Sequence, residues 1–305
     1  MKHLEICREY FNTFGKPMIE NKFPQIKDRF AAGLVGEGSG CFGFDDEISR
    51  DHDFAPGFCI WLKDKDFAEF GHQLSASYNN LPSEFMGIKK SSIIAPERLG
   101  VMKISDFYMS FTGCPDIPSS NMDWFLISES NLASVTNGEV FEDRSGEFNR
   151  IRKGFQNFYP EDVLLKKLAA RCAVMSQSGQ YNFERCIRRG DKVSAELSLA
   201  RFTEAAISIT HLLYRKPAPF YKWSFRNLSL FDTQTASLIL NLWQNDGFEA
   251  VTHHIEALCQ RITSLLCEQG YVTPNGSFLQ DYIPQLMNSI EDPDIRSMHP
   301  MADCL

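Results

Sequence analysis

Several signals that identify common protein classes are missing from this sequence of 305 residues. It has nine cysteines but no CxxC pair, so zinc ribbons and thioredoxin-like redox centres have no support. No run approaches the roughly 20 apolar residues of a membrane span, and no apolar signal core follows the N-terminus. We therefore expect a cytoplasmic protein, without a membrane partner, whose cysteines are buried free thiols.

An excess of basic residues is also missing. The formal net charge is −8, which argues against a nucleic-acid partner. The spacing D-x-[DN]-x-[DN]-G of an EF-hand calcium loop is absent, which disfavours an interaction protein built on such a loop. Hydrophobic residues make up 43% and charged residues 23%, and 25 phenylalanines predict aromatic-rich cores. The chain is long enough for two globular domains.

The pattern of the chain changes near residue 145. Before that point strands and helices alternate, which predicts an α/β or α+β layer. We expect helices over 3–13 and 19–31, strands within 31–38, 54–63 and 101–104, a helix after Asp64, and a helix and turn within 124–143. From 146 onward apolar residues recur at helical spacing, including one long helical segment over 181–215. The predicted domains are 1–145 and 146–305, with an irregular, proline-containing tail over 284–305.

One stretch carries most of the functional signal: GEGSGCFGFDDEISRDHDF, residues 36–54. Gly38-Ser39 follows a predicted strand, and such a turn presents backbone N–H groups and a hydroxyl to phosphate oxygens. After eleven residues comes Asp51-His52-Asp53. On a strand, the two aspartates would share one face. A carboxylate pair of this spacing suits Mg²⁺, and a phosphate turn beside it suits phosphoryl or nucleotidyl transfer. The alternatives are an ordinary turn and a solvated acidic face.

The stretch resembles a known superfamily. A Gly-Ser pair, a gap of about nine to thirteen residues, and D-x-D before an apolar residue are the signature of polymerase-β-type nucleotidyltransferases. The wider wording is closest to a bacterial domain-of-unknown-function family, number 4037, of predicted nucleotidyltransferases. Later landmarks extend the resemblance over roughly residues 25–230; they are VTNGEVFED (135–143), Tyr159-Pro160-x-Asp162-Val163, Arg189-Gly190-Asp191 and PFYKW (219–223).

The resemblance implies an α+β fold: a nucleotidyltransferase-like mixed sheet with helices, followed by a mostly helical domain. It implies Asp51 and Asp53 as catalytic ligands of Mg²⁺ or Mn²⁺, with Gly38 and Ser39 on the β- or γ-phosphate. In PFYKW, Lys222 would bind phosphate or base and Tyr221 would stack, and Arg189 would bind nucleotide by the same reasoning. A lysine lying over an apolar core is the alternative for Lys222.

The sequence departs from the family pattern at three positions. The superfamily supplies a third carboxylate from a later strand, and here Lys103 occupies the expected place. Glu139 is the other candidate, as a metal ligand or as general base for the acceptor hydroxyl. Gly40 stands where the family often has Glu, and Ala55 where it often has Gly.

Two hypotheses remain open. The first is an enzyme that moves a nucleoside monophosphate from a nucleoside triphosphate to an acceptor and releases pyrophosphate. The acidic charge and the helical domain favour a small molecule over protein or RNA as acceptor. The second is a catalytically weakened nucleotide-binding or regulatory protein that lacks the third carboxylate. The sequence indicates neither the preferred nucleotide nor the oligomeric state.

Overall fold

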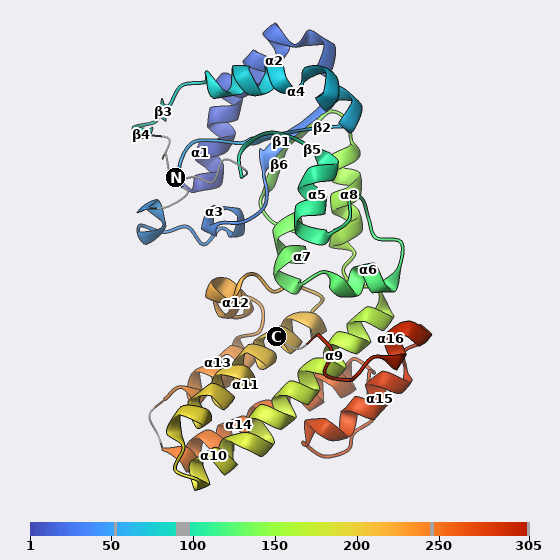
Figure 1. The fold of residues 1–305 in the computed structure, drawn as a ribbon. Coiled ribbons are helices and arrows are strands. Elements are labelled where there is room, and N and C mark those ends of the chain that lie inside the picture. Colours follow the sequence, from blue (N-terminus) through green and yellow to red (C-terminus); the bar gives the residue numbers. More distant parts are fainter. Residues whose placement is uncertain (52–53, 90–97, 245–246, 304–305) are drawn as a thin grey trace. The chain divides into compact units, whose positions relative to one another are not determined.

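The computed structural model describes residues 1–51, 54–89, 98–244 and 247–303 (Figure 1). The chain divides into two compact units, which contain Met1–Pro118 with Leu126–Asn157 (unit 1) and Ser119–Phe125 with Phe158–Leu305 (unit 2). Unit 1 contains a mixed four-stranded sheet and helices, and the described part of unit 2 is built of helices and loops, so the predicted α+β class is confirmed. The sequence patterns predicted a domain boundary at residue 145. In the structure α8 (Glu147–Gln156) still belongs to unit 1, so that unit extends beyond residue 145.

The sheet of unit 1 has four strands, and the first strand of the chain is one of its two inner strands. β1 (Phe30–Leu34) is buried along its whole length and pairs antiparallel with β2 (Cys59–Leu62) and with β6 (Glu139–Asp143). β2 also pairs in parallel with β5 (Gly100–Lys103), which gives the order β5-β2-β1-β6. The structure has a strand in each of the three predicted regions: β1 and β2 are shorter than predicted, and β5 has the predicted length but begins one residue earlier. β6 is a strand that the sequence patterns did not predict.

Helices and short turns make up the rest of unit 1. The predicted helix over 19–31 is wrong, because proline at 24 stops the helix and Phe30 already begins β1. The elements are α1 (His3–Tyr10), the π-helical η1 (Phe11–Gly15), α2 (Lys16–Lys22), η2 (Pro24–Ile26), α3 (Ser39–Phe42), η3 (Ile48–Asp51), α4 (Asp64–Asn79), the hairpin β3 (Glu84–Phe85) and β4 (Ile88–Lys89), α5 (Ile104–Thr112) and α7 (Glu129–Thr136).

Alternation along β2 fills a core on each face of the sheet. Ile60 and Leu62 join a buried cluster with residues of α1, η1, α2 and α4. Trp61 points to the opposite face and stacks on Phe148 of α8, with ring centroids 4.0 Å apart. Phe107 of α5 meets the same tryptophan edge-on at 5.4 Å. The aromatic-rich core expected from composition therefore fixes α5 and α8 against the sheet (Figure 1).

Unit 2 consists mainly of helices. The predicted helix over 181–215 is interrupted, because Gly190 (φ +73°) ends one helix and Asp191 caps the next. The tail, expected to be irregular, contains two short helices. The elements are α6 (Asn121–Leu126), α9 (Glu161–Met175), the π-helical η4 (Ser176–Phe183), α10 (Glu184–Arg188), α11 (Lys192–Leu213), α12 (Tyr221–Leu228), α13 (Thr233–Leu242), α14 (Phe248–Glu268), η5 (Leu279–Tyr282), α15 (Ile283–Asn288) and α16 (Pro293–Ser297).

Two of the general expectations can be compared with the structure. No helix within the described ranges has the length and apolar character needed to cross a membrane. The eight cysteines of these ranges are free thiols, and five of them are buried. Burial raises the pKa of Cys7 to about 12, so this thiol stays protonated and unreactive near neutral pH.

Candidate functional site: the pocket at the Gly38-Ser39 turn

The turn after β1 opens into a pocket of unit 1. Residues 34–41 line one side of this pocket, whose volume is about 600 Å³, and β5 and α5 line the other side. That volume is in the range of small-molecule sites. Gly36 (φ +126°) and Gly38 (φ +103°) both adopt backbone conformations that favour glycine. A side chain at Gly38 would meet nothing within 4 Å, so the backbone at Gly38 faces open space, as a phosphate-binding turn must.

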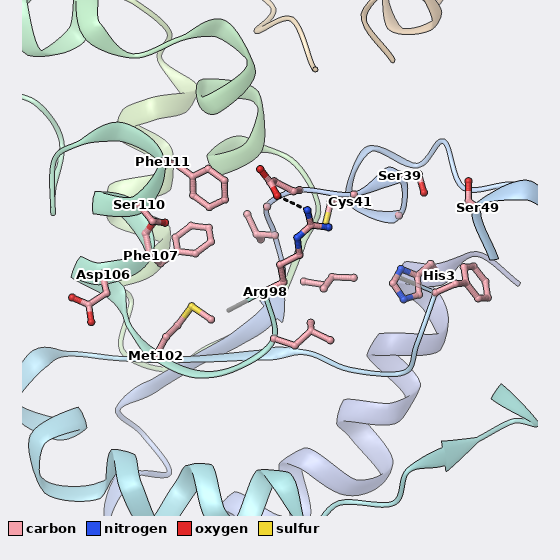
Figure 2. Close-up of a pocket in the computed structure, with 18 of the residues that line it drawn as sticks. His3, Ser39, Cys41, Ser49, Arg98, Met102, Asp106, Phe107, Ser110 and Phe111 are labelled. Carbon is pink, nitrogen blue, oxygen red and sulfur yellow. Dashed lines mark hydrogen bonds and ion pairs between the residues drawn. The ribbon is translucent and has the colours of Figure 1, made fainter. Parts of the chain in front are cut away.

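Ser39 begins α3, directly after the glycine turn. The structure gives its hydroxyl no hydrogen-bond partner among the described residues, and the side chain lies at the pocket (Figure 2). A hydroxyl in this position can donate to a ligand oxygen without breaking an existing bond. The sequence prediction of a glycine-rich turn at Gly38-Ser39 after a strand therefore matches the observed geometry.

The glycine turn is held from the far side by the NGEV element. Asn137 Nδ2 donates to the Gly36 carbonyl at 2.6 Å, and the Gly36 N–H donates to Asn137 Oδ1 at 3.0 Å. The Gly138 N–H donates to the Cys41 carbonyl at 2.8 Å. Arg152 of α8 donates in turn to the Thr136 carbonyl at 2.9 Å, and burial lowers the pKa of this arginine. Three of these four hydrogen bonds thus join the glycine turn to Asn137 and Gly138, about a hundred residues later in the chain, and the fourth holds the neighbouring Thr136.

The pocket wall opposite the turn is apolar and aromatic. The rings of Phe107 and Phe111 point from α5 into the pocket and meet edge-on, with centroids 5.3 Å apart (Figure 2). Met102 of β5 adds a polarizable side chain beside them. A flat aromatic or heterocyclic group could stack on this wall while its anionic end reaches the turn. Sequence analysis did not identify this wall, because periodic apolar residues in a helix predict only a core.

Charged groups lie at the pocket as ion pairs. Arg98 Nη2 lies 2.7 Å from Glu37 Oε2, and Figure 2 shows this pair beside the glycine turn. Asp106, in the first turn of α5, pairs with Lys103 at 3.4 Å. Met102 lines the pocket, but Lys103 does not. Lys103, which occupies the place where the third carboxylate was expected, therefore does not contribute to the pocket wall.

Glu139, the other predicted carboxylate, lies on β6. It forms an ion pair with Arg8 of α1 and is not among the residues that line the pocket. Asp53 lies outside the described residues. Asp51 ends η3, and its side chain is not described. Its described neighbours in the chain, Ser49 and Phe54, both line the pocket.

A metal site was tested against the donor atoms present. Magnesium takes hard oxygen ligands, usually two or more carboxylates together with ligand and water oxygens. Among the side chains that the structure describes, which do not include those of Asp51 and Asp53, no three His, Cys, Asp or Glu cluster so that they could hold a metal ion. The donor set of the predicted Mg²⁺ or Mn²⁺ site would therefore have to include side chains outside that set.

The N-terminal helix closes the other end of the pocket. His3 Nε2 lies 3.0 Å from the Ala55 carbonyl, and the ring stacks on Phe54 at 4.9 Å. Lys2 Nζ donates to the Asp45 carbonyl at 2.8 Å. A side chain at Gly40 would meet His3 Nδ1 at 2.3 Å. The close approach of His3 thus leaves no room at position 40 for the Glu that the family resemblance leads us to expect there.

We expect Gly40→Glu to disturb the site rather than to restore a metal ligand. The new side chain must displace His3, and we expect a loss of about 2 kcal/mol in the free energy of unfolding. Chemical denaturation of Gly40→Glu, His3→Ala and the double variant would measure this. Removal of the imidazole makes room, so the loss in the double variant should be smaller than the sum of the two single losses. Additive losses would mean that the two positions do not interact.

The remaining predicted residues lie in unit 2, whereas the pocket lies in unit 1. Tyr221 begins α12 with its side chain exposed, and Lys222 Nζ lies 5.1 Å from the centre of the Trp223 ring. Arg189 is exposed at the end of α10. Asp191 caps α11, and hydrogen bonds from Ser194 lower the pKa of this carboxyl. Asp191 thus has a local structural role, and a nucleotide-binding role for Arg189, Tyr221 and Lys222 stays a prediction.

Residues 124–224 match the model of a family described as "Domain of unknown function (DUF4037)", which confirms the predicted resemblance to that family over about a third of the chain. The matched region includes Asn137 and Gly138, whose hydrogen bonds to Gly36 and Cys41 form a clamp on the glycine turn. No curated protein matches the chain.

Among solved structures, the chain is similar to one described as a nucleotidyltransferase-like protein from Exiguobacterium sibiricum 255-15. The identity is 10%, the similarity covers 92% of this chain and 81% of that one, and the TM-score is 0.40.

Proposed function

On the premise that residues 124–224 belong to a DUF4037 region, we propose that the protein is a metal-dependent nucleotidyltransferase. It would move a nucleoside monophosphate from a nucleoside triphosphate to an acceptor hydroxyl, with a small molecule favoured over protein or RNA. The observation that supports this most is the pocket itself. Its glycine turn faces open space, a serine hydroxyl lies beside the turn, and an aromatic wall stands opposite.

In the proposed reaction the acceptor oxygen attacks the α-phosphorus, the bond between the α- and β-phosphates breaks, and pyrophosphate leaves. The Gly38 and Ser39 backbone and the Ser39 hydroxyl bind the outer phosphates, and Phe107 and Phe111 receive the base. The proton of the acceptor passes to a carboxylate. Asp106 and Glu37 are the carboxylates of the pocket wall, and Glu139 stays the candidate from sequence.

Asp51 and Asp53 are the proposed ligands for Mg²⁺ or Mn²⁺, on the spacing to Gly38-Ser39. The chemistry that such an ion supplies when bound is neutralisation of the phosphate charge and activation of the attacking oxygen. Ser49 and Phe54, close to them in the chain, lie at the pocket that holds the phosphate turn, which is consistent with this assignment.

A second candidate is a nucleotide-binding or regulatory protein without transfer activity. The observation that favours it is on β5, where the pocket wall receives Met102 rather than a carboxylate. Both candidates predict nucleotide binding in the pocket, and only the first predicts transfer.

The test combines transfer and binding measurements. The protein is incubated with each labelled nucleoside triphosphate, Mg²⁺ or Mn²⁺, and a cell extract, and binding is measured by calorimetry. Ser110 is exposed and lines the pocket, so Ser110→Trp should fill it and weaken nucleotide binding about tenfold or more. Met109, exposed and adjacent but not at the pocket, provides the matched control Met109→Trp.

The possible results separate the candidates. Label transfer that Ser110→Trp abolishes and Met109→Trp retains supports the enzyme. Nucleotide binding without transfer to any component of the extract supports the second candidate. Equal binding by both variants would contradict the placement of the nucleotide in this pocket.

A further inference from the structure

Helix α9 of unit 2 contains three basic side chains that solvent hardly reaches. Lys166 and Lys167 are 0% exposed and Arg171 is 3% exposed. All residues of α9 from Val163 to Met175 are buried, so the helix has no solvent-facing side for its charges. Removing an ammonium or guanidinium group from water costs several kcal/mol unless partners replace the water. These three cations therefore require a specific anionic or polar environment.

The C-terminal segment Pro300–Asp303 supplies much of that environment. Lys166 Nζ donates to the carbonyls of Pro300 at 3.1 Å and Ala302 at 2.9 Å. Asp303 Oδ2 lies 3.1 Å from Lys167 Nζ and 3.2 Å from Arg171 Nη1. The Asp303 carbonyl also accepts a hydrogen bond from Arg171. One carboxylate and three carbonyl oxygens of this segment thus bind three buried cations.

These polar contacts hold the segment to α9. Residues 300–303 form turns and are half-buried, so they separate the buried cations from solvent. Asp303 adopts a left-handed backbone conformation (φ +71°), which is less favourable for a residue with a side chain than for glycine. A half-exposed segment in an unfavourable conformation can be displaced when another anion offers the cations equivalent oxygens.

Unit 2 has a cavity of its own, which lies next to this segment. It measures about 270 Å³, and Met301 of the segment forms part of its wall. The other walls come from α9, the π-helical η4 and α11, and include Ser178, Asn182, Ser198 and Arg201. π-helical turns often occur at functional sites. The hydroxyl, amide and guanidinium groups of this cavity, which Met301 joins to the segment, would suit the polar remainder of a small ligand.

We propose that Lys166, Lys167 and Arg171 form an anion site for phosphate-bearing small molecules, and that Pro300–Asp303 occupies it as a built-in competitor. Two ammonium groups and a guanidinium match the multiple charge and the several oxygens of a phosphate or polyphosphate. Binding of the ligand would release the C-terminal segment, and the segment would limit binding to ligands with enough charge. The alternative is a permanent structural clasp.

The probe is inorganic tripolyphosphate, and the readout is specific for the C-terminal segment. Carboxypeptidase Y digests the full-length protein, and mass spectrometry follows the removal of residues 300–303. Tripolyphosphate should accelerate removal about tenfold over sodium chloride at equal ionic strength. Lys167→Gln should abolish this dependence on the anion. Asp303→Asn should lower the half-maximal concentration about tenfold, because the competing charge is gone.

The matched control is Asp294→Asn, which removes an exposed carboxylate from the same part of the chain and should behave like the unmodified protein. A chain that ends at His299 should bind tripolyphosphate directly by calorimetry. If this shortened chain folds and binds none, or if digestion is insensitive to the anion, the segment is a structural clasp and the proposal is wrong. If the shortened chain does not fold, equal responses of Asp303→Asn and Asp294→Asn overturn it. Binding that Lys167→Gln leaves unchanged lies elsewhere, which also overturns it.

Discussion

Replacing both Asp51 and Asp53 by Asn should reduce nucleotidyl transfer by about a thousandfold or more, which corresponds to about 4 kcal/mol of transition-state stabilisation. Asn keeps the size and shape of Asp but removes the negative charge that a hard divalent ion requires. Binding of the nucleoside triphosphate should weaken much less, because the glycine turn, the Ser39 hydroxyl and the aromatic wall do not depend on the two carboxylates. Transfer assays and calorimetry on the same preparation measure the two effects.

The control for this variant is Glu47→Gln, which removes an exposed carboxylate from the same acidic stretch. It should retain full transfer activity. If lower negative charge alone reduced activity, this control would lose activity too. Transfer that persists in the double Asn variant would sink the assignment of Asp51 and Asp53 as metal ligands. Equal loss in both variants would indicate an electrostatic effect of the stretch as a whole.

The sequence was sufficient to predict a glycine turn after a buried strand, and its position; phosphate binding by that turn stays a prediction. Small apolar residues over 31–34 indicated a buried strand, and the glycines that follow can adopt positive φ values that other residues avoid. These are local properties, and β1 with Gly36 and Gly38 agrees with them. The metal half of the prediction lies partly outside the described residues, so it rests on spacing and resemblance.

The clamp on the turn could not be predicted from local patterns. Asn137 and Gly36 are 101 positions apart, and a hydrogen bond of that sequence separation leaves no periodic signal. The NGEV element was noticed as a family landmark, and its glutamate rather than its asparagine was assigned a role. The strand β6 was missed for a related reason. Its residues are half-buried and three of the five are acidic, so the alternation that identifies a strand is weak.

The buried cations of α9 show a different limit. Lys166, Lys167 and Arg171 belong to a helix that periodicity predicted, and basic residues in such a helix are ordinarily exposed. Their burial depends on a segment more than a hundred residues later in the chain. Proline content described that segment only as irregular. Charge pairing between distant segments follows from the tertiary fold, and neither helix propensity nor composition encodes it locally.

The clamp leads to the second large effect, which we expect from Gly138→Ala. Gly138 has φ +59°, and a Cβ atom there would lie 2.1 Å from the Leu34 carbonyl oxygen at the end of β1. Backbone cannot move aside as a flexible side chain can, so the NGEV turn must shift. We expect unit 1 to lose about 3 kcal/mol or more in its free energy of unfolding. Chemical denaturation measures this loss, and calorimetry should show weaker nucleotide binding because the Asn137 contacts to Gly36 loosen.

Gly113→Ala separates the steric effect from the backbone effect. Gly113 ends α5 in the same unit with φ +72°, and a Cβ atom there would meet nothing within 4 Å. This variant should lower the free energy of unfolding by only about 1–2 kcal/mol, the cost of placing alanine in a left-handed conformation. Nucleotide binding should not change. If the two variants are equally stable, the close approach of Gly138 to β1 does not limit the fold. If Gly138→Ala is unstable but binds nucleotide normally, the NGEV turn supports the sheet without shaping the pocket.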